Sequence, residues 1–168
     1  MDQRMIEPTP GSLALDRSEK ALRRAIELFF FAYRDFTQEA DALLAHYGFG
    51  RAHHRVIYFV GRHPGVSVSE LLTILKITKQ SLSPVLGQLM REGFVVQRPD
   101  PMDRRRRRLH LTAEAEALEQ QLTARQASRI AAAFEDAGAE AACGFTNVLR
   151  AIINKEDRQR VETIGRSA

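Results

Sequence analysis

Five consecutive arginines, Arg104 to Arg108, stand between two short segments, 94–98 and 109–111, that have the composition of β-strands. Guanidinium groups form paired hydrogen bonds with phosphate oxygens, and a basic tract of this kind is typical of a nucleic-acid-binding patch. The connecting segment 99–103 contains two prolines. It cannot continue either strand, because proline fixes φ and lacks the N–H that a ladder needs. We therefore expect the arginines to occupy the tip and the returning strand of a hairpin; a merely solvated charge run is the alternative.

The positive charge of the chain is concentrated around this hairpin. Residues 67–112 contain nine Lys and Arg residues against four acidic ones, whereas the whole chain of 168 residues has a net charge of +4. All of the excess positive charge therefore lies in the middle third, as expected for a local polyanion footprint. The length predicts one domain, and 44% hydrophobic residues are enough to form its core.

Several classes of protein are disfavoured by the same sequence. The single cysteine, Cys143, excludes an internal disulfide framework and a multi-cysteine zinc site. The N-terminus has no apolar signal core, and no segment approaches the roughly 18 apolar residues of a membrane span, so we expect a cytoplasmic protein. No nucleophile–base constellation, phosphate loop or metal-ligand spacing stands out, and we expect neither an enzyme nor a cofactor.

Two short helices precede the hairpin and are joined by a tight turn at residues 76–77. Ser67 and Glu70 form a capping box that opens the first, and Thr78 can cap the second, which runs from Lys79 to Arg91. Gly93 then ends the second helix, and the hairpin follows at once. Two helices with this connection and a strand pair behind them form a winged helix-turn-helix.

Longer helical patterns flank this region. Apolar spacing predicts a helix that starts at a capping box of Asp16 and Glu19 and continues to Tyr47, and a helix of this length can bury one face in its own domain and another in a partner. After a helix over 51–62 and the winged region, helical spacing returns at 113–136 and 139–154, with interruptions expected at Gly138 and Gly144. We expect a mainly α fold with a small β-hairpin wing, a winged helix-turn-helix flanked by long dimerisation helices. As one integrated domain it comprises a flexible arm (1–15), an N-terminal dimerisation helix (16–50), a DNA-binding region (51–112) and C-terminal dimerisation helices (113–165).

The wing carries the most specific motif. From Asp100 to Thr112 the sequence matches D-x-x-D-x-R, three variable positions, an apolar residue, one more position and L-T. This pattern resembles the wing of the MarR family of bacterial winged-helix transcription factors, and the likeness extends over about residues 20–155. Two departures lie in the second short helix. Pro84 predicts a kink or a shortened helix, and Gly87 replaces a side chain that could contact DNA.

The resemblance implies that the second short helix enters the major groove of double-stranded DNA. Gln80 is the best candidate for a paired amide contact with an adenine edge. Phosphate contacts at the helix N-terminus are expected from Thr78, Lys79 and Ser81. For each residue the alternative is an ordinary solvated helix face. The candidate DNA-binding residues of this helix are Thr78, Lys79, Gln80, Ser81, Ser83 and Gln88.

The resemblance also implies that the wing lies over the adjacent minor groove. Arg105 is then the inserted residue, and Asp103 would hold its guanidinium group in place. Narrow A·T-rich minor grooves have an enhanced negative potential that favours such an arginine. The remaining arginines of the run, including Arg108, would meet phosphates or face solvent. The candidate DNA-binding residues of the wing are Arg98, Asp103, Arg104, Arg105, Arg106 and Arg107.

MarR relatives commonly bind small aromatic or phenolic ligands that release DNA, and the resemblance implies such an effector here. The candidate lining residues are Tyr33, Phe36, His54, Arg55 and Tyr58, for each of which packing or a surface position is the alternative. Cys143 lies far from the first helix, where thiol-based sensors of the family place their cysteine, and we expect it to be buried and inert. His53 and His54 diverge by about 100° on a helix, so they form no metal-ligand pair.

The leading hypothesis is a sequence-specific transcriptional repressor that acts as a homodimer. A two-fold dimer predicts a pseudo-palindromic operator with half-sites about one helical turn apart. Two alternatives stay open. One is a non-specific architectural DNA-binding protein, which Pro84 and Gly87 favour. The other is a protein-interaction module with a vestigial DNA surface.

Overall fold

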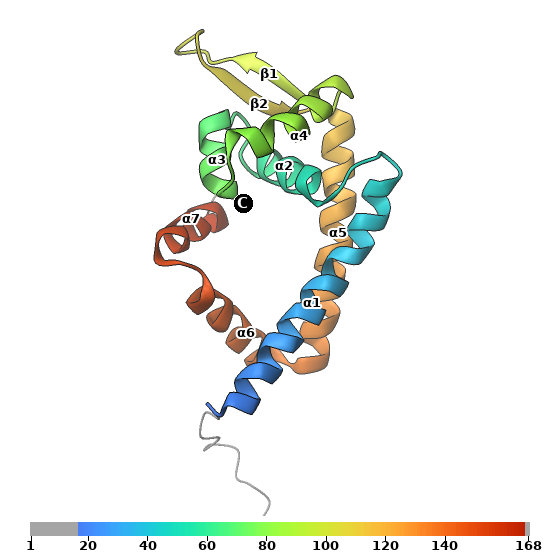
Figure 1. Cartoon of the computed structure of the whole chain (residues 1–168), viewed down its shortest axis with the longest axis vertical. Helices are drawn as coiled ribbons and strands as arrows, with labels where there is room; N and C mark the ends of the chain where they lie inside the picture. The colour runs from blue at the N-terminus through green and yellow to red at the C-terminus, as the bar shows by residue number, and fades with distance from the viewer. Residues whose placement is uncertain (1–16, 167–168) are drawn as a thin grey trace, which may run out of the picture. The chain divides into compact units, whose positions relative to one another are not determined.

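The computed structural model describes residues 17–166, with the side chains of residues 160 and 162–166 left out of the description. Helices account for most of these residues, and one pair of strands forms an antiparallel hairpin, which confirms the predicted fold class (Figure 1). The elements are, in chain order, α1 (Glu19–Ala45), α2 (Arg51–Arg62), α3 (Val68–Leu75), α4 (Lys79–Arg91), β1 (Val95–Pro99), β2 (Arg107–Leu111), α5 (Ala113–Ala137), α6 (Ala139–Ile152) and α7 (Lys155–Arg166).

The chain divides into two compact units, the first ending at Phe36 and the second beginning at Thr37. The described part of the first unit is the N-terminal portion of α1. Ser18 caps this helix, because its Oγ accepts a hydrogen bond from the backbone N–H of Ala21 at 3.2 Å. Asp16, the predicted cap, lies outside the described residues. The large apolar side chains of this portion are exposed: Leu22, Ile26, Leu28, Phe29, Phe30, Phe31 and Tyr33.

The second unit has one hydrophobic core, which the helix-turn-helix, the hairpin and α5 share. Leu71 of α3, Leu89 of α4, Leu109 of β2 and Leu118 of α5 are all fully buried in it. These leucines face inward at helical or strand spacing, so the polar and basic residues between them face outward. The core therefore fixes which side of α4 is available to a partner.

Local hydrogen bonds define the helix-turn-helix as predicted. Ser67 Oγ accepts from the N–H of Glu70, and the carboxylate of Glu70 accepts from the N–H of Ser67 at 2.8 Å, which completes the capping box. Lys76 has a left-handed backbone with φ of 52°, which turns the chain between the two helices. Thr78 Oγ1 accepts from the N–H of Ser81 at 3.2 Å and opens α4.

Helix α4 keeps its full predicted length from Lys79 to Arg91 with Pro84 inside it, so the expected shortening does not occur. Pro84 has no N–H to donate to the carbonyl of Gln80. Both residues are exposed, so water can satisfy this carbonyl and the helix continues.

The hairpin pairs Val95 with Leu111 at its base and Pro99 with Arg107 at its end. Pro99 therefore closes β1, and the prediction that it could not belong to a strand is wrong. The reason is its terminal position, where a missing N–H costs little. A bridge between Val66 and Leu109 attaches β2 to the segment before α3. The hairpin is thus held against the body of the second unit at its base, while its connection projects.

The helices after the hairpin differ from the expectation in three places. Gly138, with φ of 85°, separates α5 from α6 as predicted, but α6 continues through Gly144, where an interruption was expected. A further helix, α7, was not predicted. Cys143 is exposed rather than buried, because α6 has no buried residue. None of the described helices is long and apolar enough to cross a membrane.

Candidate nucleic-acid interface

The outer face of α4 is polar and open. Leu82, Leu86 and Leu89 bury its inner face, which leaves Lys79 and Gln80 exposed at its first turn. No described residue pairs with the side chain of either. The hydroxyl of Ser83 donates to the carbonyl of Lys79 at 2.8 Å, and the hydroxyls of Thr78 and Ser81 lie 3.0 Å apart. Of the six predicted recognition-helix residues, Lys79 and Gln80 are therefore the most available to a partner.

Gln88 is the least available of the six, because both ends of its amide are engaged within the chain. Its Oε1 lies 3.0 Å from His53 Nε2, and its Nε2 donates to Glu92 Oε1 at 2.9 Å. His53 is itself held by the N–H of Gly50, which donates to Nδ1 at 3.1 Å, and by stacking on Phe49. This arrangement ties the start of α2 to α4, and it gives Gln88 a structural partner that the sequence did not reveal.

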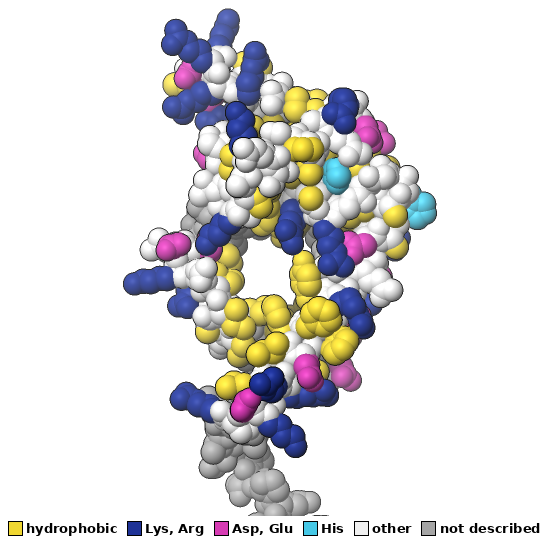
Figure 2. Space-filling model, viewed as in Figure 1, with side chains coloured by type: hydrophobic (Ala, Val, Ile, Leu, Met, Phe, Trp, Pro, Cys, Tyr) yellow, Lys and Arg dark blue, Asp and Glu magenta, His cyan; other side chains and the backbone are white. Residues whose placement is uncertain are grey.

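The arginines of the connection are exposed at the end of the hairpin. Arg104, Arg105 and Arg107, together with Arg98 on β1, are exposed, and no described residue pairs with their guanidinium groups. Figure 2 shows Lys and Arg side chains, in dark blue, gathered over the hairpin at the top of the view. Because the base of the hairpin is held by the core, these charges project from a fixed support.

Asp103 was expected to hold the guanidinium group of Arg105, but its carboxylate makes other contacts. Its Oδ1 accepts from the backbone N–H of Arg105 at 3.0 Å, and its Oδ2 lies 3.4 Å from Nε of Arg106. A carboxylate two residues before an N–H commonly closes a local turn in this way. Asp103 therefore shapes the backbone of the connection, and the side chain of Arg105 is left to project.

Arg108 differs from the other arginines of the run, because it faces into the protein. Its Nε donates to Asp100 Oδ2 at 2.6 Å, while its Nη1 donates to the carbonyl of Gly65 at 3.2 Å and to Glu70 Oε2 at 3.3 Å. Arg108 was expected to meet phosphate or to face solvent, whereas in the free protein its guanidinium group is paired with these three residues. Sequence reasoning missed the network. The available signal was the spacing, since a hairpin that turns between residues 100 and 107 brings Asp100 near Arg108.

The ionisation of this network follows its hydrogen bonds. The N–H of Met102 and then the guanidinium group of Arg108 lower the pKa of Asp100. The bond to Asp100 raises the pKa of Arg108. The hydroxyl and N–H of Ser67 lower the pKa of Glu70, with a smaller contribution from Arg108. All three groups are charged at neutral pH, so the network holds two acids around one base.

The predicted effector residues belong to both units and are described separately. Tyr33 and Phe36 lie on the first unit. In the second, His54 is half-buried, and burial lowers its pKa against the opposing effects of Asp41 and Glu119. Arg55 is exposed, and the ring of Tyr58 packs edge-on against Phe59 at 5.2 Å. That these residues bind an effector stays a prediction.

No group of three or more His, Cys, Asp or Glu residues within the described part of the chain is placed to hold a metal ion. His53 is occupied by Gly50 and Gln88, as described above. The exposed thiol of Cys143 lies on α6. The chemistry that the site offers is therefore that of hydrogen-bond donors and fixed positive charge.

Comparisons with known proteins agree with this geometry and with the resemblance of the wing motif. A family model described as the MarR family matches residues 47–106. The HTH-type transcriptional regulator PetP of Rhodobacter capsulatus is 41% identical over 154 residues, which cover 92% of this chain and 93% of that protein. The crystal structure of the MarR family transcription regulator SP03579 matches with a TM-score of 0.68 at 19% identity, over 89% of this chain and 95% of that one. The crystal structure of Streptococcus pneumoniae FabT in complex with DNA matches with a TM-score of 0.65 at 20% identity, over 77% of this chain and 95% of that one.

Proposed function

Because the chain belongs to the MarR family of winged helix-turn-helix transcriptional regulators, we propose that it is a repressor that binds double-stranded DNA sequence-specifically as a homodimer. The observation that carries this proposal is the set of unpaired arginines held at the end of a core-anchored hairpin, in the same unit as a helix with a polar outer face. The chain acts in the cytoplasm, where its DNA target lies.

In this proposal α4 enters the major groove. Gln80 reads an adenine edge with its free amide, and Lys79 binds phosphate beside it. The hydroxyls of Thr78, Ser81 and Ser83 lie on the same turns and make additional contacts with the DNA. Gln88 has a smaller part, because His53 and Glu92 already occupy its amide.

The wing supplies the second contact. Arg105 enters the minor groove, since its side chain projects while Asp103 fixes its backbone. Phosphates on either side bind Arg98, Arg104, Arg106 and Arg107. FabT of Streptococcus pneumoniae was crystallised in complex with DNA, and its likeness in fold supports the proposal that this chain binds DNA.

A second copy of the chain covers the exposed apolar side chains. On the first unit these include Ile26 and Phe30, which are 69% and 62% exposed. On α6 they are Phe145, Val148 and Ile152, of which Ile152 is 63% exposed. Several exposed apolar side chains on one helix, as on α1 and on α6 taken separately, are typical of an interaction site, and a two-fold dimer presents two winged units to a pseudo-palindromic operator.

Repression follows when this dimer occupies a promoter and excludes the transcription machinery. A small aromatic or phenolic effector releases the DNA. Its candidate contacts on the second unit are His54, Arg55 and Tyr58. The neutral imidazole that burial favours at His54 suits an uncharged ring.

The test is selection of bound fragments from sheared genomic DNA at physiological salt, with wild type beside Arg105→Ala. One enriched inverted-repeat site, lost or blurred by the substitution, is the expected result. Uniform recovery of fragments would instead support the architectural alternative, which the exposed Pro84 and the engaged amide of Gln88 favour. Failure to recover any fragment at low salt would refute DNA binding and favour a protein-interaction module.

A further inference from the structure

We propose that Arg108 is a positioning residue that fixes the wing against α3, and that it does not contact DNA. This inference rests on the proposed function in its final step, because a fixed wing matters for binding a groove. Its first step, that Arg108 orders the connection of the hairpin, concerns the free protein. The run of five arginines thus divides into contacting residues and one anchor.

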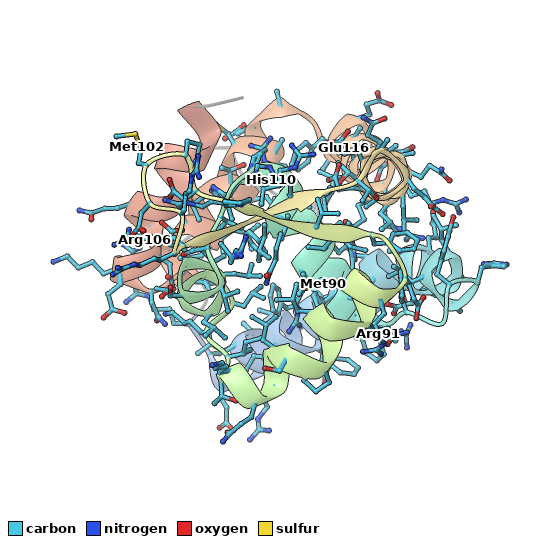
Figure 3. The ribbon with its side chains drawn as sticks, turned by 90° about the horizontal axis from the view of Figure 1, so that it is seen from above. Met90, Arg91, Met102, Arg106, His110 and Glu116 are labelled. Atoms are coloured by element: carbon cyan, nitrogen blue, oxygen red, sulfur yellow. The ribbon has the colours of Figure 1, made fainter. Side chains whose placement is uncertain are left out.

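Asp100 is the centre of the arrangement. Its backbone N–H donates to the carbonyl of Arg106 at 3.0 Å, and its Oδ1 accepts from the N–H of Met102 at 2.8 Å. Its Oδ2 accepts from Nε of Arg108 at 2.6 Å. One residue therefore joins the outgoing side of the connection, the returning side and the side chain of Arg108. Figure 3 shows Met102 and Arg106 at this end of the hairpin, on the opposite side of the view from Met90 and Arg91 of α4.

Arg108 extends this arrangement to the helix-turn-helix. Its Nη1 reaches the carbonyl of Gly65, just before α3, and the carboxylate of Glu70, which is part of the capping box of α3. The side chain spans 43 positions of sequence to Gly65 and 38 to Glu70. These contacts link the connection of the wing to the first turn of α3, beyond the bridge between Val66 and Leu109 that holds the hairpin at its base.

The burial of Asp100 explains why Arg108 stays within the protein. Asp100 is only 6% exposed, and its carboxylate has Arg108 as its charged partner. If Arg108 turned toward a phosphate, the carboxylate of Asp100 would keep the N–H of Met102 but lose its charged partner, which is unfavourable for a carboxylate with little access to water. Arg107, the preceding residue, is exposed because successive side chains of a strand point to opposite faces. It has no such constraint.

The charge of Asp100 makes a sharp test. Asp100→Asn removes a negative charge from the DNA-facing region, so electrostatics alone predicts tighter binding. If Arg108 anchors the wing through Asp100, the same substitution should instead weaken DNA binding. Asparagine can still accept from the N–H of Met102, but it cannot balance the charge of Arg108. We expect about tenfold weaker binding of a labelled duplex recovered by the wild-type protein, which corresponds to about 1.4 kcal/mol.

Arg107→Gln and Arg108→Gln form a matched pair, since each removes one positive charge from adjacent positions of β2. The salt dependence of binding separates them. Loss of a phosphate contact lowers the magnitude of the slope of log K against log salt by about 0.9, as we expect for Arg107→Gln. Arg108→Gln leaves the slope near that of wild type while weakening the affinity. Arg108→Lys keeps the charge but only one point of contact, and we expect it to recover part of the affinity.

Hydrogen–deuterium exchange of the free protein measures, without DNA, whether Arg108 and Asp100 order the connection of the hairpin. Asp100→Asn and Arg108→Gln should speed exchange of the amide hydrogens of residue 100 and residues 102–106, whereas Arg107→Gln should not. Far-UV circular dichroism and thermal melts confirm that each variant is folded. Unchanged exchange in both anchor variants would refute the anchor, and so would wild-type or tighter DNA binding by folded Asp100→Asn. If wild type binds no duplex while the anchor variants exchange faster, the proposed function fails and the anchor stands.

Discussion

Replacement of Phe30 by aspartate should convert the proposed dimer into a monomer. Phe30 lies on α1, where its ring is 62% exposed and packs edge-on against Phe31 at 5.4 Å. Burial of a whole phenylalanine side chain contributes about 1.5–3 kcal/mol, so covering the exposed part of Phe30 contributes about 1–2 kcal/mol. In a two-fold dimer the contact occurs twice, which gives about 2–4 kcal/mol, a change of roughly 30- to 1,000-fold in the dissociation constant.

The charge of the new aspartate adds to this loss, because burial of a carboxylate at an apolar interface removes its hydration. Size-exclusion chromatography with light scattering at micromolar concentration measures the outcome. Wild type should elute at twice the chain mass of 19.0 kDa, and Phe30→Asp at 19.0 kDa. The matched control is Lys20→Asp, which places the same side chain at an exposed polar position of the same helix and should leave the dimer intact.

Two results would refute this reasoning. Wild type at 19.0 kDa would mean that the exposed apolar side chains of α1 have another role. A dimeric Phe30→Asp would mean that the two-fold interface excludes this part of α1. A monomeric variant should also lose most of its affinity for an inverted repeat, because one winged unit then binds one half-site alone.

Three further outcomes follow from the second unit. Leu109→Ala should destabilise the fold by about 2–5 kcal/mol in urea unfolding, because Leu109 is fully buried where the hairpin meets the core. Burial lowers the pKa of His54 from its ordinary value of 6.5, so the unfolded chain binds more protons between the two values. The stability that comes from burying the neutral imidazole of His54 is therefore complete above about pH 6.5. It decreases as the pH falls toward the pKa of His54 in the folded protein. His54→Gln should remove this part of the pH dependence of unfolding; an identical profile would contradict it. Asp100 has a lowered pKa, so its stabilising pair with Arg108 is present above the ordinary pKa of aspartate and is lost in acid. In acid, the rate of amide exchange in the wing, corrected for its intrinsic pH dependence, should rise in wild type. It should change less in Asp100→Asn.

The helices of the second unit were predictable where local chemistry decides their ends. Ser67 with Glu70 and Thr78 with Ser81 are hydrogen-bond pairs three residues apart, and α3 and α4 begin where these signals place them. Gly144 was misinterpreted, because an exposed glycine costs a helix only about 1 kcal/mol and its neighbours compensate. The polar sequence of α7 has no apolar stripe from which a helix could be predicted.

The site was predictable in its residue types but not in its pairings. The exposed arginines and the polar face of α4 follow from strand and helix periodicity. Asp100 pairs with Arg108 from only eight positions away, and the hairpin spacing could have indicated that pair. The contacts of Gln88 with His53 and of Arg108 with Glu70 span 35 and 38 positions, and they depend on how α2 packs on α4 and on the register of the hairpin. No local pattern contains that information, because the same side chains would face solvent if the register moved by one residue.

The pairing of Arg108 changes how the charge of the wing should be counted. If all five arginines of the run 104–108 neutralised phosphates, the run would contribute up to about −4.5 to the slope of log K against log salt. With Arg108 held by Asp100 and Glu70, at most four arginines of the run remain, and the limit for the run falls to about −3.6. Arg106 has only a long, exposed contact with Asp103, which a phosphate can replace at little cost. The same distinction explains why a basic run can be both a structural element and a binding element. In the proposal made above, the arginine that balances a buried acid sets the position of the wing, and the other arginines of the run use that position to meet DNA.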